Sequence, residues 1–347
     1  DINLLWLGIV NWIPYFWAFW ALQYYSNNPL KRKIILLLLL FGSFPVILTG
    51  ISQYFFKIHG PFTLFSGLIT WYSRPILNYD GMSGLFNNAN YTGTWLNIIW
   101  PIALTLFLEK KSSFNQKLIS LLFLIFSAIC LILTYSRNAW LIFLISTVII
   151  LGYKSLKWII PILIVFTSAV LLSIGIIQNP YLIDFSRSIV PELIWNYRFS
   201  TFGLENFSNF GRIEIWDTAI RLIIQRPIWG WGAASFPFIF ESLNGAYKGH
   251  THNLPLELAF SFGLPVAILI IGTILYIFYI SRKNIFSSKN YINKYPYEIA
   301  WWTSSISIFT SQMFDIQYFD IRIALIFWVF VGGLRNIVDI KKSEVKT

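Results

Sequence analysis

Nine long apolar stretches constrain this chain more than any other feature of its sequence. A helix needs about 20 mostly apolar residues to cross the hydrocarbon core of a bilayer. Stretches near that length occupy residues 3–24, 34–53, 91–108, 118–135, 139–153, 158–177, 254–280, 297–314 and 321–336. The sequence therefore predicts an all-α polytopic membrane protein with about nine transmembrane helices.

The charge composition supports a membrane protein rather than a nucleic-acid binder. Charged residues make up only 12% of the 347 residues, whereas soluble domains contain about 25%. The formal net charge is +11, but the basic residues form short clusters between the apolar stretches. Such clusters are typical of cytoplasmic loops. We therefore expect membrane lipids, and no nucleic acid, as the surroundings of this chain.

The positions of the basic residues also predict the orientation. Most of the 26 Lys and Arg residues lie in the links after the odd-numbered stretches, which marks these links as cytoplasmic. This orientation places Asp1 outside. Because the chain starts there without Met, we expect one or more upstream helices, or a signal, to precede it.

Arginine dominates the basic residues on the outer face. A guanidinium group offers a planar fork of donors that suits phosphate and carboxylate. The outer face is therefore expected to recognise an anionic ligand, although pairing with Asp could account for some of these residues. The outer arginines are Arg74, Arg137, Arg187, Arg198, Arg212, Arg221, Arg226 and Arg322.

A large outer loop interrupts the single membrane domain of residues 1–347. It covers residues 178–253 and is too long for a plain connector. Residues 211–227 within it have helical periodicity and predict an interfacial amphipathic helix. Its predicted apolar stripe consists of Ile213, Trp216, Ile220 and Ile223.

Two arginines stand at positions that favour a ligand. Arg212 begins the predicted interfacial helix, where the helix dipole disfavours a cation. Arg137 lies in the very short turn TYSRNAW. The alternative role for Arg137 is structural, with its side chain reaching toward the membrane interface so that the charge lies in water. Arg221 lies four residues after Asp217, so an ion pair within the helix is the simpler interpretation of that arginine.

The segment GHTHNLPLELAFSFG (residues 249–263) contains two of the three histidines, His250 and His252. Either Thr251 or Asn253 can cap the helix that follows. The His-x-His spacing suggests a metal, but no Cys, third His or carboxylate follows in a standard ligand pattern, so no metal is expected. A neutral imidazole here could act as a general base for a hydroxyl group, or only as a capping group.

The order of four motifs carries a resemblance to a known family. TYSRNAW, GRIEIW, RPIWGWG and HTHNLPLELAFSFG together resemble the O-antigen ligase and polymerase superfamily of bacterial membrane glycosyltransferases. GLFNNANYTGTW (residues 84–95) resembles that family's pattern too. The likeness extends from about Trp12 to Arg335 and is strongest to the cyanobacterial branch once proposed to take up inorganic carbon.

The resemblance implies a reaction and its residues. His252, followed by Asn253 and then by Gly263 after nine further residues, matches the functional histidine, and Arg137 and Arg212 match the two essential arginines. The implied donor is a glycan on undecaprenyl diphosphate in the bacterial inner (plasma) membrane, and the acceptor is a glycan or lipid hydroxyl on the periplasmic side. No metal, nucleotide sugar or other cofactor is implied. The expected substrate-binding residues are His250, Asn253, Arg226, Arg221 and Asn90.

Two other functions are compatible with the sequence. A bicarbonate transporter would place ionisable residues near the bilayer midplane; the predicted spans hold almost none, and Glu257 is the nearest case. A non-catalytic scaffold would tolerate replacement of the outer arginines. The motifs do not distinguish a ligase from a polymerase.

Overall fold

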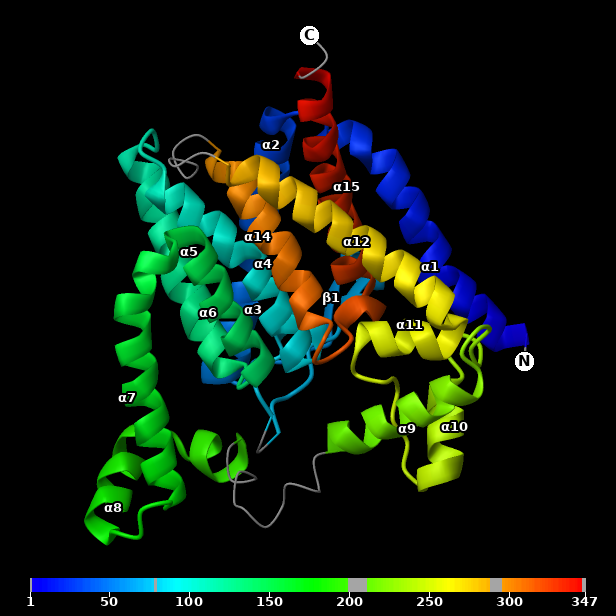
Figure 1. The fold of residues 1–347 in the computed structure, drawn as a ribbon. Coiled ribbons are helices and arrows are strands. Elements are labelled where there is room, and N and C mark those ends of the chain that lie inside the picture. Colours follow the sequence, from blue (N-terminus) through cyan, green and yellow to red (C-terminus); the bar gives the residue numbers. More distant parts are fainter. Residues whose placement is uncertain (1, 78–79, 199–210, 288–294, 345–347) are drawn as a thin grey trace.

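The computed structural model describes residues 2–77, 80–198, 211–287 and 295–344, and within them the chain is a helical bundle with smaller helices at one end (Figure 1). One antiparallel hairpin, β1 (Phe62–Leu64) with β2 (Ile69–Trp71), is the sheet of the described residues. The helices are α1 (Ile2–Leu22), α2 (Pro29–Gly42), α3 (Phe44–Phe55), α4 (Ala89–Leu108), α5 (Phe114–Leu133), α6 (Arg137–Leu151), α7 (Leu156–Ile174), α8 (Pro180–Ile189), α9 (Gly211–Gln225), α10 (Phe236–Asn244), α11 (Leu254–Phe262), α12 (Leu264–Ile285), α14 (Pro296–Ser311) and α15 (Ile321–Glu344).

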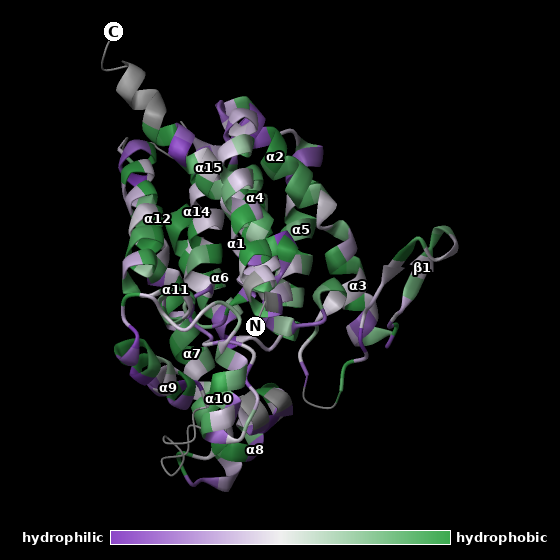
Figure 2. Cartoon of the chain, turned by 90° about the vertical axis from the view of Figure 1, so that its right-hand side faces the viewer, coloured by the Kyte–Doolittle hydropathy of each residue, from purple (hydrophilic) through white to green (hydrophobic). Residues whose placement is uncertain are grey.

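Six segments among the described residues are long and apolar enough to cross a membrane. They are Pro29–Phe55, Ala89–Leu108, Phe114–Leu133, Tyr153–Ile174, Leu264–Ile285 and Ile321–Val338. Hydrophobic residues, in green, predominate along the long helices in Figure 2. These features are those of an all-α polytopic membrane protein. The total of nine spans stays a prediction, because α1, α6 and α14 are helices but are not among the six.

The centre of the bundle is formed by α4 and α14, which are buried along most of their length. Small residues let these helices and α6 approach closely. A Cβ atom on Gly93 of α4 would lie only 2.5 Å from the Cβ of Ala139 in α6. Ser304 of α14 donates a hydrogen bond to the carbonyl of Ile98 in α4. This tight packing fixes the ends of α4, α6 and α14 relative to one another.

The predicted continuous stretch 254–280 is wrong in one respect, because the structure divides it into α11 and α12 at Gly263. Gly263 has a φ of 85°, and a Cβ there would lie 2.0 Å from the carbonyl oxygen of Ile228. The amide of Leu264 donates to the carbonyl of Pro227 at 2.7 Å. The preceding loop therefore packs into the break, which hydropathy alone does not reveal.

The predicted outer loop carries α8, α9 and α10 at one end of the bundle (Figure 1). The helix predicted at 211–227 is confirmed as α9. Its predicted apolar stripe coincides only partly with the face that α9 buries in the bundle. Ile213 and Ile220 are exposed, Trp216 is half-buried, and the buried residues are Ile215, Thr218, Ala219, Leu222 and Ile223.

Candidate functional site

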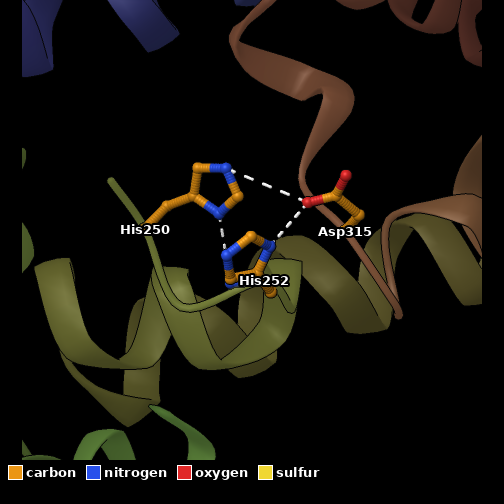
Figure 3. A group of neighbouring side chains, drawn as sticks. All are labelled: His250, His252 and Asp315. Carbon is orange, nitrogen blue, oxygen red and sulfur yellow. Dashed lines mark hydrogen bonds and ion pairs between the residues drawn. The ribbon is translucent and has the colours of Figure 1, made fainter. Parts of the chain in front are cut away.

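The histidine segment meets the segment after α14 at the end of the bundle near α11 (Figure 3). The Nδ1 atom of His252 lies 2.6 Å from Oδ1 of Asp315. Asp315 is buried, at 3% exposure, and the His252 side chain is 26% exposed. The pair therefore joins a buried carboxylate to an imidazole that remains accessible.

The start of α11 explains why His252 faces Asp315. Asn253 caps α11 through its side-chain oxygen, which accepts from the amide of Leu256 at 3.0 Å. The same side chain donates from Nδ2 to the carbonyl of Met313 at 3.0 Å. Leu254 adds a backbone hydrogen bond to the carbonyl of Gln312 at 2.9 Å. These contacts attach the histidine segment to the end of α14, and they confirm the predicted Asn253 cap.

A buried carboxylate holds the turn between the two histidines. The backbone N–H of Thr251 donates to Oε2 of Glu257 at 2.9 Å. His252 itself has a φ of 55°, a left-handed conformation that non-glycine residues rarely adopt. Such backbone conformations persist where the surroundings impose them, and they concentrate at functional sites.

His250 packs against His252 and stays neutral at neutral pH. Its Nδ1 accepts from the backbone N–H of His252 at 3.1 Å, so the neutral ring carries its proton on Nε2. That Nε2 lies 4.0 Å from Oδ1 of Asp315. Burial lowers the pKa of His250 to about 4, and the charge of His252 is the next largest cause. Arg212 also lowers this pKa, whereas Asp315 raises it.

Asp315 is ionised in this arrangement. Burial alone would raise the pKa of Asp315, but the hydrogen bond and charge of His252 hold it below its usual value, helped by His250 once that ring is protonated in acid. A hydrogen bond from Asn90 acts in the same direction. An ionised Asp315 accepts from Nδ1–H of His252, which leaves Nε2 of His252 as the basic nitrogen.

Asn90 connects this pair to the start of α6. Its Nδ2 donates to Oδ2 of Asp315 at 2.8 Å, and its Oδ1 accepts from the hydroxyl of Ser136 at 2.7 Å. Ser136 is the N-cap of α6, accepting from the amide of Ala139 at 3.3 Å. Arg137 is the next residue and the first of α6, and its side chain is exposed. A continuous chain of hydrogen bonds thus runs from His252 to the residue beside Arg137.

The remaining sequence-predicted arginines have different surroundings. Arg212 is the second residue of α9 and acts electrostatically on His250. Arg221 forms the expected ion pair with Asp217, at 2.6 Å and largely exposed. Arg226 lies over the ring of Trp231, 4.2 Å from its centroid. The described contacts of Arg221 and Arg226 are therefore within their own segments rather than with the histidines.

Asp315 is the residue that the sequence interpretation missed. It lies 63 residues after His252, immediately beyond a predicted span that ends at residue 314. An acidic residue at the predicted outer end of a predicted span was the available signal, but nothing in the spacing links it to the histidines.

Asp315 also changes the basis of the metal prediction. Donor atoms of His250, His252 and Asp315 lie within 4.8 Å of one another, a group that could hold a metal ion. The sequence argument considered only carboxylates at a standard ligand spacing, and Asp315 comes from a distant segment. The absence of a metal stays a prediction. Two imidazoles and a carboxylate are ligands that catalytic zinc sites use, so the group offers either a His–Asp pair or a metal centre.

Two cavities adjoin each other near α11, and His250 lines the smaller of them. An apolar groove of ≈ 570 Å³ lies between α1 and α12, with Trp229 and Trp231 in its lining. A more polar cavity of ≈ 340 Å³ is lined by Asn11, His250 and Glu257. The two share Gly8, Trp12, Ala233 and Ser261 in their linings. An apolar groove therefore continues into a polar cavity that reaches His250.

These features define a polytopic helical membrane protein with a histidine–carboxylate site at one end of its bundle. A family model described as O-antigen ligase matches residues 122–271. This match supports the O-antigen ligase superfamily, and it includes Arg137, Arg212, His250 and His252 but neither Asn90 nor Asp315. No curated protein matches the chain. The likeness to the cyanobacterial branch stays a prediction.

Proposed function

We propose that this protein is a membrane glycosyltransferase that moves a glycan from undecaprenyl diphosphate to an acceptor hydroxyl, as a ligase or polymerase. The observation that carries the proposal is the 2.6 Å contact between His252 and Asp315. An imidazole oriented by a buried carboxylate is an arrangement that serves general-base chemistry. The matched O-antigen ligase family supplies the substrate class, a lipid-linked glycan.

In the proposed reaction, the acceptor oxygen attacks the anomeric carbon of the glycan. The new bond between carbon and acceptor oxygen forms as the bond from that carbon to the diphosphate oxygen breaks. Nε2 of His252 takes the hydroxyl proton, and the departing diphosphate keeps the electron pair. Asp315 stabilises the resulting imidazolium through its hydrogen bond to Nδ1.

Arg137 and Arg212 are proposed to bind the diphosphate. Negative charge develops on this leaving group, and two guanidinium groups can meet it with bidentate hydrogen bonds. Arg137 is held at the start of α6 beside Ser136, and Arg212 is the second residue of α9, within electrostatic reach of His250. The arginines would meet the charge of the diphosphate, and Asp315 is hydrogen-bonded to His252 with no ion between them. We therefore propose that the transfer needs no metal.

The adjoining cavities suit the two halves of such a donor. The groove between α1 and α12 is lined mainly by apolar side chains such as Leu4, Ile9 and Ile270, and we assign it the polyprenyl chain. The polar cavity at His250 and Glu257 is assigned to sugar and diphosphate. His250 then lines the place of the sugar and diphosphate, and Asn253 and Asn90 shape the site. In a bacterium, this end of the bundle would face the periplasm from the inner membrane.

Genetic complementation tests the proposal. His252→Ala, Arg137→Ala and Arg212→Ala variants should insert into the membrane normally, lose surface glycan and accumulate the undecaprenyl-linked glycan. Normal surface glycan with all three variants would contradict the proposal. Bicarbonate accumulation in proteoliposomes that contain only this protein would favour the transport alternative instead.

A further inference from the structure

The hairpin between α3 and α4 has one polar and one apolar face. Phe62 pairs with Trp71, Thr63 with Thr70, and Leu64 with Ile69. Because side chains alternate across a strand, the first and third pairs share one face and the threonine pair lies on the other. One face is therefore wholly apolar, and its residues are Phe62, Leu64, Ile69 and Trp71.

This apolar face is only partly covered by the described residues, because Phe62 is half-buried and the other three residues are exposed. Leu64, Ile69 and Trp71 are 55%, 44% and 38% exposed. At the turn, Phe65 and Leu68 are 75% and 83% exposed. A single two-stranded hairpin is at best marginally stable in water, so an apolar face of this kind needs a surface to pack against.

The base of the hairpin is fixed to the bundle. Gln53 of α3 donates from Nε2 to the carbonyl of Arg74 at 2.6 Å. Asn87 donates to the carbonyl of Tyr72 at 2.9 Å and accepts from the amide of Arg74 at 2.9 Å. Figure 2 shows the hairpin projecting sideways from the bundle beyond the end of α3. Its direction is thus set by its base.

The hairpin begins where a candidate span ends. It follows α3, whose last residue is also the last of the apolar segment Pro29–Phe55. A projection that leaves the bundle sideways at this level runs along the boundary between bilayer and water. Phe44 and Leu48 of α3 are exposed as well, so apolar surface continues from the span to the hairpin. Aromatic residues such as Phe65 and Trp71 are enriched at this boundary.

We propose that the hairpin of residues 61–72 is a membrane anchor whose apolar face packs into the lipid leaflet at the histidine end of the bundle. Phe65, Leu68 and the four residues of the apolar face enter the boundary between headgroups and acyl chains. Thr63 and Thr70 face water. The occupant of this face is bilayer lipid, and the proposal does not depend on the enzymatic function.

The single cysteine of the chain makes a direct test possible. Cys130 is fully buried, so a Cys130→Ala background accepts one nitroxide label at a chosen site. Labels at Leu68→Cys and Leu64→Cys report on the apolar face, and Thr70→Cys is the matched control on the opposite face of the same hairpin. The same label at Leu122→Cys, on the exposed side of α5, gives the reference value for bilayer, and the label at the exposed position Lys111→Cys gives the reference value for water.

The labelled protein is placed in lipid nanodiscs. For each nitroxide label, the rate of collision with oxygen, which concentrates in bilayers, is compared with the rate of collision with a water-soluble nickel chelate. The proposal predicts that the labels at Leu68 and Leu64 have an oxygen-to-nickel ratio several-fold above that at Thr70 and close to that at Leu122. A ratio at both positions like that at Lys111 would overturn it. Labels shielded from both reagents would also overturn it, because they would show a protein partner or a second copy on this face.

Discussion

Nδ1 of His252 lies 2.6 Å from Oδ1 of Asp315, although 63 residues separate the two in the chain. The contact exists because α11 is capped by Asn253 and attached through that residue to the segment after α14. Four segments of the chain are thus linked in one hydrogen-bond network, since Asn90 of α4 bonds to Asp315 and Ser136 before α6 bonds to Asn90.

Replacement of Asp315 tests the role of this contact. Asp315→Asn keeps the shape but cannot stabilise a protonated His252, so the transfer rate should fall by about 10²-fold or more. The measurement is single-turnover transfer of lipid-linked glycan by the purified variant. Asp80→Asn, at an exposed ion pair with Arg74, is the matched control and should transfer at the wild-type rate. An equal loss in both variants would argue against a specific role for Asp315.

Arginine-to-lysine changes test diphosphate binding. Arg137→Lys and Arg212→Lys each keep the charge but replace a planar fork with a point charge. Each should cost about 1.5–3 kcal/mol of transition-state stabilisation, the contribution of a charged hydrogen bond, or about a tenfold to hundredfold loss in kcat/KM. The same change at Arg74 serves as the surface control. Unchanged kinetics in both site variants would remove the arginines from the mechanism.

Asn90→Ala tests the hydrogen-bond chain through a shift with pH. Asn90 is one of the donors that hold the pKa of Asp315 below its usual value. Without it, the pKa of Asp315 should rise, so the stability that the ionised carboxylate gives the folded protein should be lost at a higher pH as the solution is acidified. Melting temperatures of the variant and the wild type across acidic pH check this, and the fall for Asn90→Ala should begin at the higher pH. A fall of equal size at every pH would indicate only structural damage.

Chelation distinguishes the two roles that His250, His252 and Asp315 permit, a His–Asp pair or a metal centre. If Asp315 acts on His252 directly, transfer by protein dialysed against a strong chelator should equal that of untreated protein. Metal content and activity are measured on the same sample. Loss of activity on chelation, restored by one added metal, would assign the three residues to a metal centre instead.

The sequence predicted the features that depend on nearby residues. The helix α9, the Asn253 cap and the Asp217–Arg221 pair are all confirmed, because periodicity, capping and i,i+4 pairing act within a few residues.

Features that depend on distant segments were not predictable in this way. The break at Gly263 follows from its contact with Ile228, and the buried face of α9 follows from what packs on it. Asp315 meets His252 only after α11 and α14 have packed. Hydropathy and spacing within one segment hold no information on such contacts.

The rate of glycan transfer by purified protein with His252→Ala tests the central claim most directly. The assay uses protein in lipid vesicles, an undecaprenyl diphosphate-linked glycan and an acceptor, and compares the variant with wild type. We predict that wild type transfers glycan without any nucleotide sugar, and that His252→Ala is slower by at least about 10²-fold while its melting temperature is retained. Transfer by His252→Ala at the wild-type rate would contradict this account.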